Sequence, residues 1–148
     1  MAPVDNYEQR FSGIGRLYTP DGLARLRQAH ICVIGIGGVG SWVVEALARS
    51  GIGEVTLIDM DDICVTNINR QLPAMSGTIG KLKTEVMSER VKLINPECTV
   101  NIIDDFISPE NQSNYLNRGY DYVIDAIDNV KTKASLIAYC KRNKINVI

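Results

Sequence analysis

A glycine-rich turn between an apolar run and a helical pattern constrains the fold of this chain more than any other feature. Residues 30–34 form a compact apolar run rich in β-branched side chains, and Gly35-Ile36-Gly37-Gly38-Val39-Gly40 follows it directly. Apolar residues then recur at helical spacing until Gly51. A strand, a G-x-G-x-x-G turn and a helix in this order are typical of the first unit of a nucleotide-binding α/β fold.

Strand-like and helix-like segments alternate along the rest of the chain. We expect further strands at 54–59, 99–103, 120–127 and 145–148, and helices at 41–50, 80–94, 109–117 and 130–142. Strands joined by helix-length crossovers predict an α/β fold, with a Rossmann-like, doubly wound and mainly parallel sheet covered by helices on both faces. Ligands of such sheets bind beyond the carboxyl ends of the strands.

The chain divides into a polar N-terminal arm, residues 1–19, and a nucleotide-binding domain, residues 20–148. Thr19 followed by Pro20 predicts the start of a short helix that ends near Ala29. We therefore expect a helical arm in front of the first strand. Because the sequence stops inside the apolar run 145–148, we interpret it as truncated, with a C-terminal substrate-binding half absent.

Composition excludes several classes of protein. Sixteen Lys and Arg against seventeen Asp and Glu give a formal charge of -1, so no overall basic field indicates nucleic acid. The four cysteines lie far apart, and with a single histidine they lack the spacing of a zinc site. The sequence contains neither a signal peptide nor an apolar stretch long enough to span a membrane. We expect a cytoplasmic protein with reduced thiols that does not bind membranes.

The glycine turn and the next strand predict where a nucleotide binds. Gly35, Gly37, Gly38 and Gly40 would let backbone N–H groups approach a phosphate at the start of a helix. Asp59 ends the next strand, where a carboxylate accepts hydrogen bonds from ribose hydroxyls. This pattern alone leaves open whether the nucleotide is NAD, FAD or ATP.

Cations and amides in the following loop favour ATP. Displacement at the α-phosphate of ATP requires positive groups near the phosphate oxygens and a magnesium ion held by a carboxylate, whereas hydride transfer does not. Either Asp125 or Asp128, at the end of the fourth strand, can supply that carboxylate. The other candidate nucleotide-binding residues of this region are Asp61, Asn67, Arg70, Gln71, Lys83 and Asn129.

At these residues the sequence resembles the ThiF/MoeB/ubiquitin-activating-enzyme superfamily of ATP-dependent adenylating enzymes. The matching segments are Arg10-Phe11, the glycine turn, Asp59-Met60-Asp61, Thr66 to Gln71, Gly80 to Lys83 and Asp125 to Asn129. The resemblance implies that Gly38 contacts ATP phosphate and that Asp59 and Asp61 face the ribose. It also implies that Asn67, Arg70 and Lys83 stabilise the phosphates, that Asp128 coordinates Mg²⁺, and that Arg70, Lys83 and Asp128 support catalysis.

Three segments are most similar to the branch of tRNA threonylcarbamoyladenosine dehydratases. They are Arg10 to Tyr18, Cys32 to Trp42 and Asp59 to Asp62. This likeness implies adenylation of the threonylcarbamoyl carboxylate of a modified tRNA, followed by cyclisation. The superfamily also implies a homodimer, in which an arginine of the arm reaches the partner's ATP. Gly13-Ile14 replaces the usual Arg-Gln pair at that place, and Arg10 or Arg16 can substitute for it.

Three other functions are compatible with the same glycine turn. The first is adenylation of the C-terminus of a ubiquitin-like sulfur-carrier protein, which would connect the chain to a cysteine desulfurase or sulfur-acceptor system. The second is an NAD-dependent oxidoreductase, against which Arg70 and Lys83 argue. The third is a nucleotide-binding module without turnover of its own. The part of the enzyme that binds the acceptor distinguishes a sulfur-carrier adenylating enzyme from a dehydratase. We expect that part to lie beyond the residues present.

Overall fold

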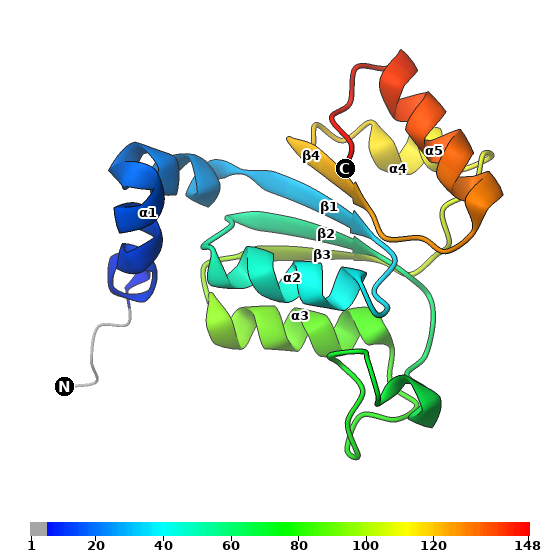
Figure 1. The fold of residues 1–148 in the computed structure, drawn as a ribbon, viewed down its shortest axis with the longest axis horizontal. Coiled ribbons are helices and arrows are strands. Elements are labelled where there is room, and N and C mark those ends of the chain that lie inside the picture. The colour runs from blue at the N-terminus through cyan, green and yellow to red at the C-terminus, as the bar shows by residue number, and fades with distance from the viewer. Residues whose placement is uncertain (1–5) are drawn as a thin grey trace.

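The computed structural model describes residues 6–148, in which four parallel strands form one sheet (Figure 1). The strands are β1 (His30–Ile34), β2 (Glu54–Ile58), β3 (Thr99–Ile103) and β4 (Tyr122–Asp125), in the order β3-β2-β1-β4. The register pairs Val33 with Leu57 of β2 and with Ile124 of β4. The chain adds β2 and β3 on one side of β1 and then crosses back to add β4 on the other side. The position between β1 and β4 is therefore the switch point of the sheet, which is where parallel sheets hold ligands.

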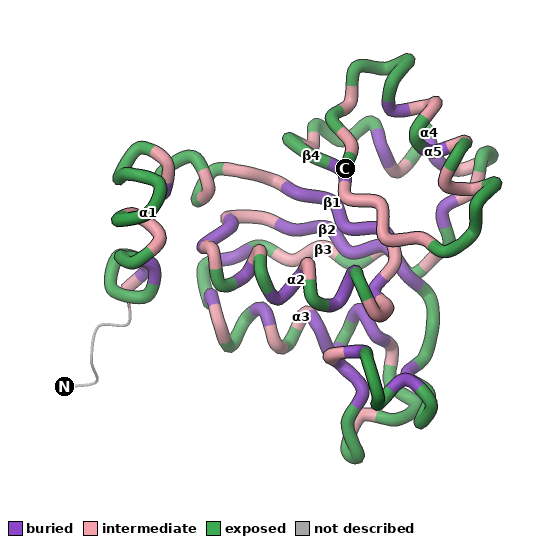
Figure 2. Tube along the Cα trace, viewed as in Figure 1, coloured by how far each residue is buried: buried purple, intermediate pink, exposed green. Residues whose placement is uncertain are grey.

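Helices cover both faces of the sheet, as predicted. On one face lie α2 (Gly40–Arg49) and α3 (Lys83–Ile94), which pack against the alternate strand residues that include Val33, Val55 and Leu57. On the other lie α4 (Gln112–Leu116) and α5 (Val130–Arg142), against the residues that include Cys32, Ile34 and Ile58. The middle strands β1 and β2 are the most buried, and β3 at the edge is partly exposed (Figure 2). The expected α/β, Rossmann-like class is confirmed.

The N-terminal helix begins earlier than the sequence predicts. Instead of starting near Pro20, α1 spans Tyr7–Gln28 with a kink at Thr19, whose φ is 70°. Asn6 caps its first turn, and Tyr7 and Phe11 pack with Leu23 in a small cluster. The Tyr7 hydroxyl donates to the carbonyl oxygen of Gly51 at 2.6 Å. These tertiary contacts outweigh the low helix propensity of a polar, glycine-containing segment.

Other element boundaries differ from the predicted ones by a few residues, except at the C-terminus. Residues 145–148 were expected to form a fifth strand, but only Val147 forms a bridge, with Val123 of β4. Hydrogen bonds from the backbone N–H of Val123 and Asp125 to Asn146 and Ile148 hold the segment beside that edge. It is therefore a short parallel extension of the sheet. Residues 1–5 of the predicted arm lie outside the described residues.

A candidate nucleotide-binding cavity

The glycine turn folds tightly between β1 and α2. Gly35 has a φ of 89°, and a Cβ atom there would lie 2.7 Å from the carbonyl oxygen of Ala126. A Cβ on Gly40 would lie 1.6 Å from the carbonyl oxygen of Gly35, so only glycine fits at the start of the helix. Gly37 and Gly38 differ, because a Cβ on either would meet only side-chain atoms at 3.5 Å or more. Their backbone forms the floor of an open cavity.

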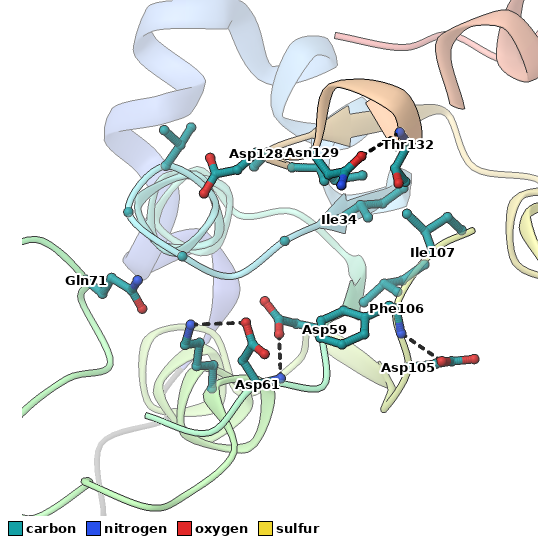
Figure 3. A pocket seen from close by; sticks show the side chains of 18 of the residues that line it. Ile34, Asp59, Asp61, Gln71, Asp105, Phe106, Ile107, Asp128, Asn129 and Thr132 are labelled. Carbon is teal, nitrogen blue, oxygen red and sulfur yellow. Dashed lines mark hydrogen bonds and ion pairs between the residues drawn. The ribbon is translucent and has the colours of Figure 1, made fainter. Parts of the chain in front are cut away.

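Asp59 ties the end of β2 to that turn. The residue is 6% exposed, and its carboxylate accepts a hydrogen bond from the backbone N–H of Ile36 and another from that of Asp61, both at 2.7 Å. Charge-assisted bonds of this length are stronger than neutral ones. Asp59 therefore shapes the turn and also lines the cavity beside it, next to Asp61 in Figure 3.

The loop after β2 and the start of α3 carry the cations of the site. Lys83, the first residue of α3, is 6% exposed, and its Nζ lies 3.6 Å from Oδ2 of Asp61. Arg70 is exposed, its stem lies over Gly38, and its backbone carbonyl accepts a hydrogen bond from Trp42 Nε1. A lysine this deeply buried is rare unless it faces a charge or a ligand. Asp61 supplies part of that charge.

Together these residues line a cavity of about 700 Å³ at the carboxyl ends of β1, β2 and β4 (Figure 3). This volume lies in the range of pockets for small molecules and cofactors. Of the predicted site residues, the cavity brings together Gly35, Gly37, Gly38, Asp59, Asp61, Arg70, Gln71, Lys83, Asp128 and Asn129. Residues from five separate segments thus converge as the sequence predicts.

Two predicted site residues, Gly40 and Asn67, do not line the cavity. Gly40 is buried against the backbone of Gly35, so it serves the close approach of helix and strand. Asn67 is buried in the short 3₁₀ helix Val65–Asn67, where its Oδ1 accepts from the backbone N–H of Cys64 at 2.9 Å. Both shape the segments that carry the site.

The two acids at the end of β4 play different parts. Asp125 is 4% exposed in its side chain and pairs with Lys133 at 2.6 Å, whereas Asp128 is exposed and lines the cavity. Asn129 caps α5 by accepting from the backbone N–H of Thr132. Within residues 6–148, no group of three or more His, Cys, Asp or Glu side chains is arranged to hold a metal ion. Magnesium that arrives with phosphates needs only one or two carboxylates, so Asp128 suits it.

Gln71 presents an unsatisfied group in the cavity wall. The residue is 8% exposed, and its Oε1 is buried without a hydrogen-bond partner among residues 6–148. In Figure 3 its amide points toward the space beside Asp59 and Asp61. A buried polar atom without a partner costs free energy, so its presence here is typical of a group that a ligand satisfies.

Sequence reasoning missed the segment that follows β3. Asp105, Phe106 and Ile107 line the cavity, as does Thr132 of α5. The rule that ligands bind at the carboxyl ends of parallel strands applies to β3 as well, and a phenylalanine three residues beyond the end of that strand was a usable signal.

Of the four cysteines, only Cys64 has a lowered pKa. Hydrogen bonds from Thr66 lower it, and the thiol is exposed beside the cavity loop. Burial raises the pKa of Cys32 to about 12 and that of Cys98 to about 11, and it also raises the pKa of Cys140. Every helix within residues 6–148 is too short or too polar to cross a lipid bilayer.

Comparison with known proteins finds relatives along most of the chain. The sequence model of the ThiF family matches residues 12–148. A tRNA threonylcarbamoyladenosine dehydratase of Haemophilus influenzae is 96% identical over the whole chain, which spans 57% of that relative. The dehydratase of Escherichia coli is 59% identical over 97% of the chain and 54% of the relative. The chain thus spans little more than half the length of these curated relatives.

Solved structures and more distant enzymes extend the comparison. The crystal structure of the E. coli tRNA N6-threonylcarbamoyladenosine dehydratase in complex with ATP superposes with a TM-score of 0.95 at 58% identity. The match covers 99% of this chain and 60% of that one. A molybdopterin-synthase adenylyltransferase of Salmonella typhimurium is 30% identical over 86% of this chain and 51% of that relative.

Proposed function

Because this chain belongs to the ThiF family, we propose that it forms the ATP-binding part of an adenylating enzyme. The observation that carries the proposal is the cavity itself. One space is bordered by the bare backbone of Gly37 and Gly38, by the stem of Arg70 that lies over Gly38, and by Lys83 and Asp59. Backbone N–H groups at a helix start, together with two cations, bind phosphates, while a strand-end carboxylate accepts ribose hydroxyls.

The residues of the cavity would then divide the work of carboxylate activation. Asp59 and Asp61 orient the ribose, and the glycine turn holds the α-phosphate for in-line attack by a substrate carboxylate. Arg70 and Lys83 stabilise the charge that develops on the departing pyrophosphate. Asp128 would hold the Mg²⁺ that accompanies ATP, which neutralises phosphate charge when bound. Gln71 donates or accepts a hydrogen bond at the cavity wall, and Asn129 fixes the start of α5.

The proposed substrate is the threonylcarbamoyl carboxylate of a modified tRNA. The likeness to two dehydratases, one of them nearly identical to this chain, supports that choice over a sulfur-carrier protein. In this reaction the carboxylate oxygen bonds to the α-phosphorus and pyrophosphate leaves. A neighbouring nucleophile of the same threonylcarbamoyl group then closes a ring and releases AMP. We expect the residues that select the acceptor to lie in the remaining part of the longer protein.

The partners of the protein are part of the same proposal. We place it in the cytoplasm as a homodimer, and a cysteine desulfurase or sulfur-acceptor system is a further candidate partner. Several large apolar side chains near the cavity loop are exposed, which supports a contact with a second copy. They are Val39, Trp42, Val65 and Ile68. Sedimentation equilibrium of the chain measures the dimer directly, and a monomer at micromolar concentration would contradict it.

Calorimetric titration with ATP-Mg²⁺, AMP and NAD tests the nucleotide. We expect ATP-Mg²⁺ to bind and NAD not to bind. Lys83→Gln and Arg70→Ala should each weaken ATP binding by about tenfold or more, because each removes a charged partner of phosphate. Lys81→Gln is the matched control, since Lys81 is exposed, precedes Lys83 by two residues and does not line the cavity. Binding of NAD without ATP would replace this proposal with an oxidoreductase.

The acceptor is tested with the longer enzyme. Release of AMP and of labelled pyrophosphate should require tRNA that carries threonylcarbamoyladenosine. Activity with a ubiquitin-like sulfur carrier instead would assign the chain to the adenylyltransferases. Nucleotide binding without turnover on either acceptor would indicate that the protein is only a nucleotide-binding module.

A further inference from the structure

One end of the cavity is apolar, and the segment after β3 builds it. Residues 104–111 connect β3 to α4 without regular secondary structure. Phe106 and Ile107 line the cavity on the side of Asp59 that lies away from Gln71 (Figure 3). Ile107 is 7% exposed and packs in the core with Ile58, whereas Phe106 is 54% exposed. An aromatic ring is thus held at the cavity mouth with one side open to solvent.

A cluster of three polar side chains fixes the backbone of Phe106. Asp105 accepts a hydrogen bond from the Tyr115 hydroxyl at 2.6 Å and one from the backbone N–H of Phe106 at 2.8 Å. Asn111 donates through Nδ2 to the carbonyl oxygen of Phe106 at 2.7 Å, and its Oδ1 accepts from the backbone N–H of Ser108. Both peptide groups of Phe106 are therefore held by side chains, in a segment that no strand or helix holds.

The cluster has a fixed direction of hydrogen bonding. The hydrogen bond from Tyr115 is the main cause that lowers the pKa of Asp105, and the same bond raises the pKa of Tyr115. At neutral pH Asp105 is therefore an acceptor only, and Tyr115 must be the donor. Tyr115 is itself anchored, because it belongs to α4, its ring packs against the core under that helix, and its carbonyl oxygen accepts from the Tyr120 hydroxyl.

We propose that Tyr115, Asp105 and Asn111 position Phe106 as the surface on which the base of the bound nucleotide stacks. This inference rests on the proposed function, because it needs the phosphates to lie at Gly38 and Lys83 and the ribose at Asp59. The base of a nucleotide placed in that way lies at the apolar end. Stacking of bases on aromatic side chains is a general source of affinity that does not depend on hydrogen bonds to the base. Tyr115 is a positioning residue, since it acts through Asp105.

Titration with two ligands distinguishes a loss of base positioning from general damage to the cavity. ATP carries base, ribose and phosphates, whereas inorganic tripolyphosphate carries phosphates alone. Both are titrated into the chain and into Tyr115→Phe, Phe106→Ala and Phe106→Tyr. Tyr139→Phe is the matched control, because Tyr139 lies in the same core and its hydroxyl has no hydrogen-bond partner among residues 6–148.

We expect Phe106→Ala to weaken ATP binding by about tenfold, as loss of one stacking contact does. Tyr115→Phe should weaken it by about fivefold, the worth of an ordinary hydrogen bond. Tripolyphosphate should bind all variants as it binds the parent chain. Phe106→Tyr, which keeps an aromatic ring, should recover most of the affinity that Phe106→Ala loses, and Tyr139→Phe should bind ATP normally.

Three results would overturn the inference. Equal losses for ATP and tripolyphosphate would show that the cluster only maintains the fold of the cavity. Normal ATP binding by Phe106→Ala would show that the base does not depend on this ring, and normal ATP binding by Tyr115→Phe would show that Tyr115 does not position the ring. A parent chain that binds neither ligand would contradict the proposed function as well, and so is distinct from the first two results.

Discussion

Two glycines of the same turn should respond oppositely to the same substitution. In Gly38→Ala the new Cβ meets only the stem of Arg70 at 3.5 Å, an ordinary contact, and the φ of Gly38 is not positive. Stability should therefore stay within about 1 kcal/mol of the parent or rise slightly. In Gly40→Ala the Cβ would overlap the carbonyl oxygen of Gly35 at 1.6 Å. Backbone must move, which costs about 3 kcal/mol or more and lowers Tm by about 6–12 °C.

Nucleotide binding should be weakened by Gly38→Ala, the substitution that leaves stability nearly unchanged. The Gly38 methyl occupies the surface that phosphate must approach, so at least one charge-assisted hydrogen bond is lost, worth about 1.5–3 kcal/mol. That corresponds to an ATP affinity about 10 to 150 times weaker. Urea unfolding gives the stability of each variant, and calorimetric titration gives the affinity. The reasoning is refuted if Gly38→Ala binds ATP like the parent chain, or if Gly40→Ala is as stable as the parent.

Three further substitutions or reactions test other parts of the structure. Glu45 bridges Arg49 and Arg90, and hydrogen bonds from Arg90 lower its pKa. Glu45→Gln should therefore cost about 1–2 kcal/mol at pH 7, limited by the partial exposure of both arginines. Because the folded pKa is depressed, this difference, measured by urea unfolding, should be constant above about pH 4.5 and shrink as pH falls further. Cys64 should be the cysteine that iodoacetamide alkylates first at pH 8, as mass spectrometry of peptides can show, and prior labelling of Cys98 would contradict its burial. Gln71→Met should leave the free energy of unfolding unchanged or raise it by up to about 1 kcal/mol, since an unpaired buried oxygen is removed. It should still weaken ATP binding in titration, and an unfolding midpoint several degrees lower would contradict this account.

The strands and the glycine turn could be predicted because their signals are local. Residues 30–34 and 54–58 are apolar β-branched runs, and Asp59 follows the second directly, so strand ends and site residues could be placed together. The convergence of Arg70 and Lys83 on that strand end also followed from the sequence, since Arg70 lies in the loop that leaves it and Lys83 begins the helix that follows.

Other features depended on contacts between distant residues. The first half of α1 is stabilised by the bond from Tyr7 to Gly51, which no local pattern shows. Asp125 and Asp128 looked alike in sequence, and only the position of Lys133 decides that Asp125 is paired and buried. Gly40 and Asn67 belong to the motifs of the site, yet both support it from outside the cavity.

The strand order β3-β2-β1-β4 means that the cavity wall beside β4 is synthesised long after the walls beside β1 and β2. The ribosome releases the glycine turn, Asp59 and Lys83 long before β4, and β1, β2 and β3 can pair within residues 30–103 alone. The wall that carries Asp128 docks only after the chain closes a longer loop back to β1, which is a slower step. A nascent chain therefore completes the lining of the cavity only in a late step, after β4 has paired with β1.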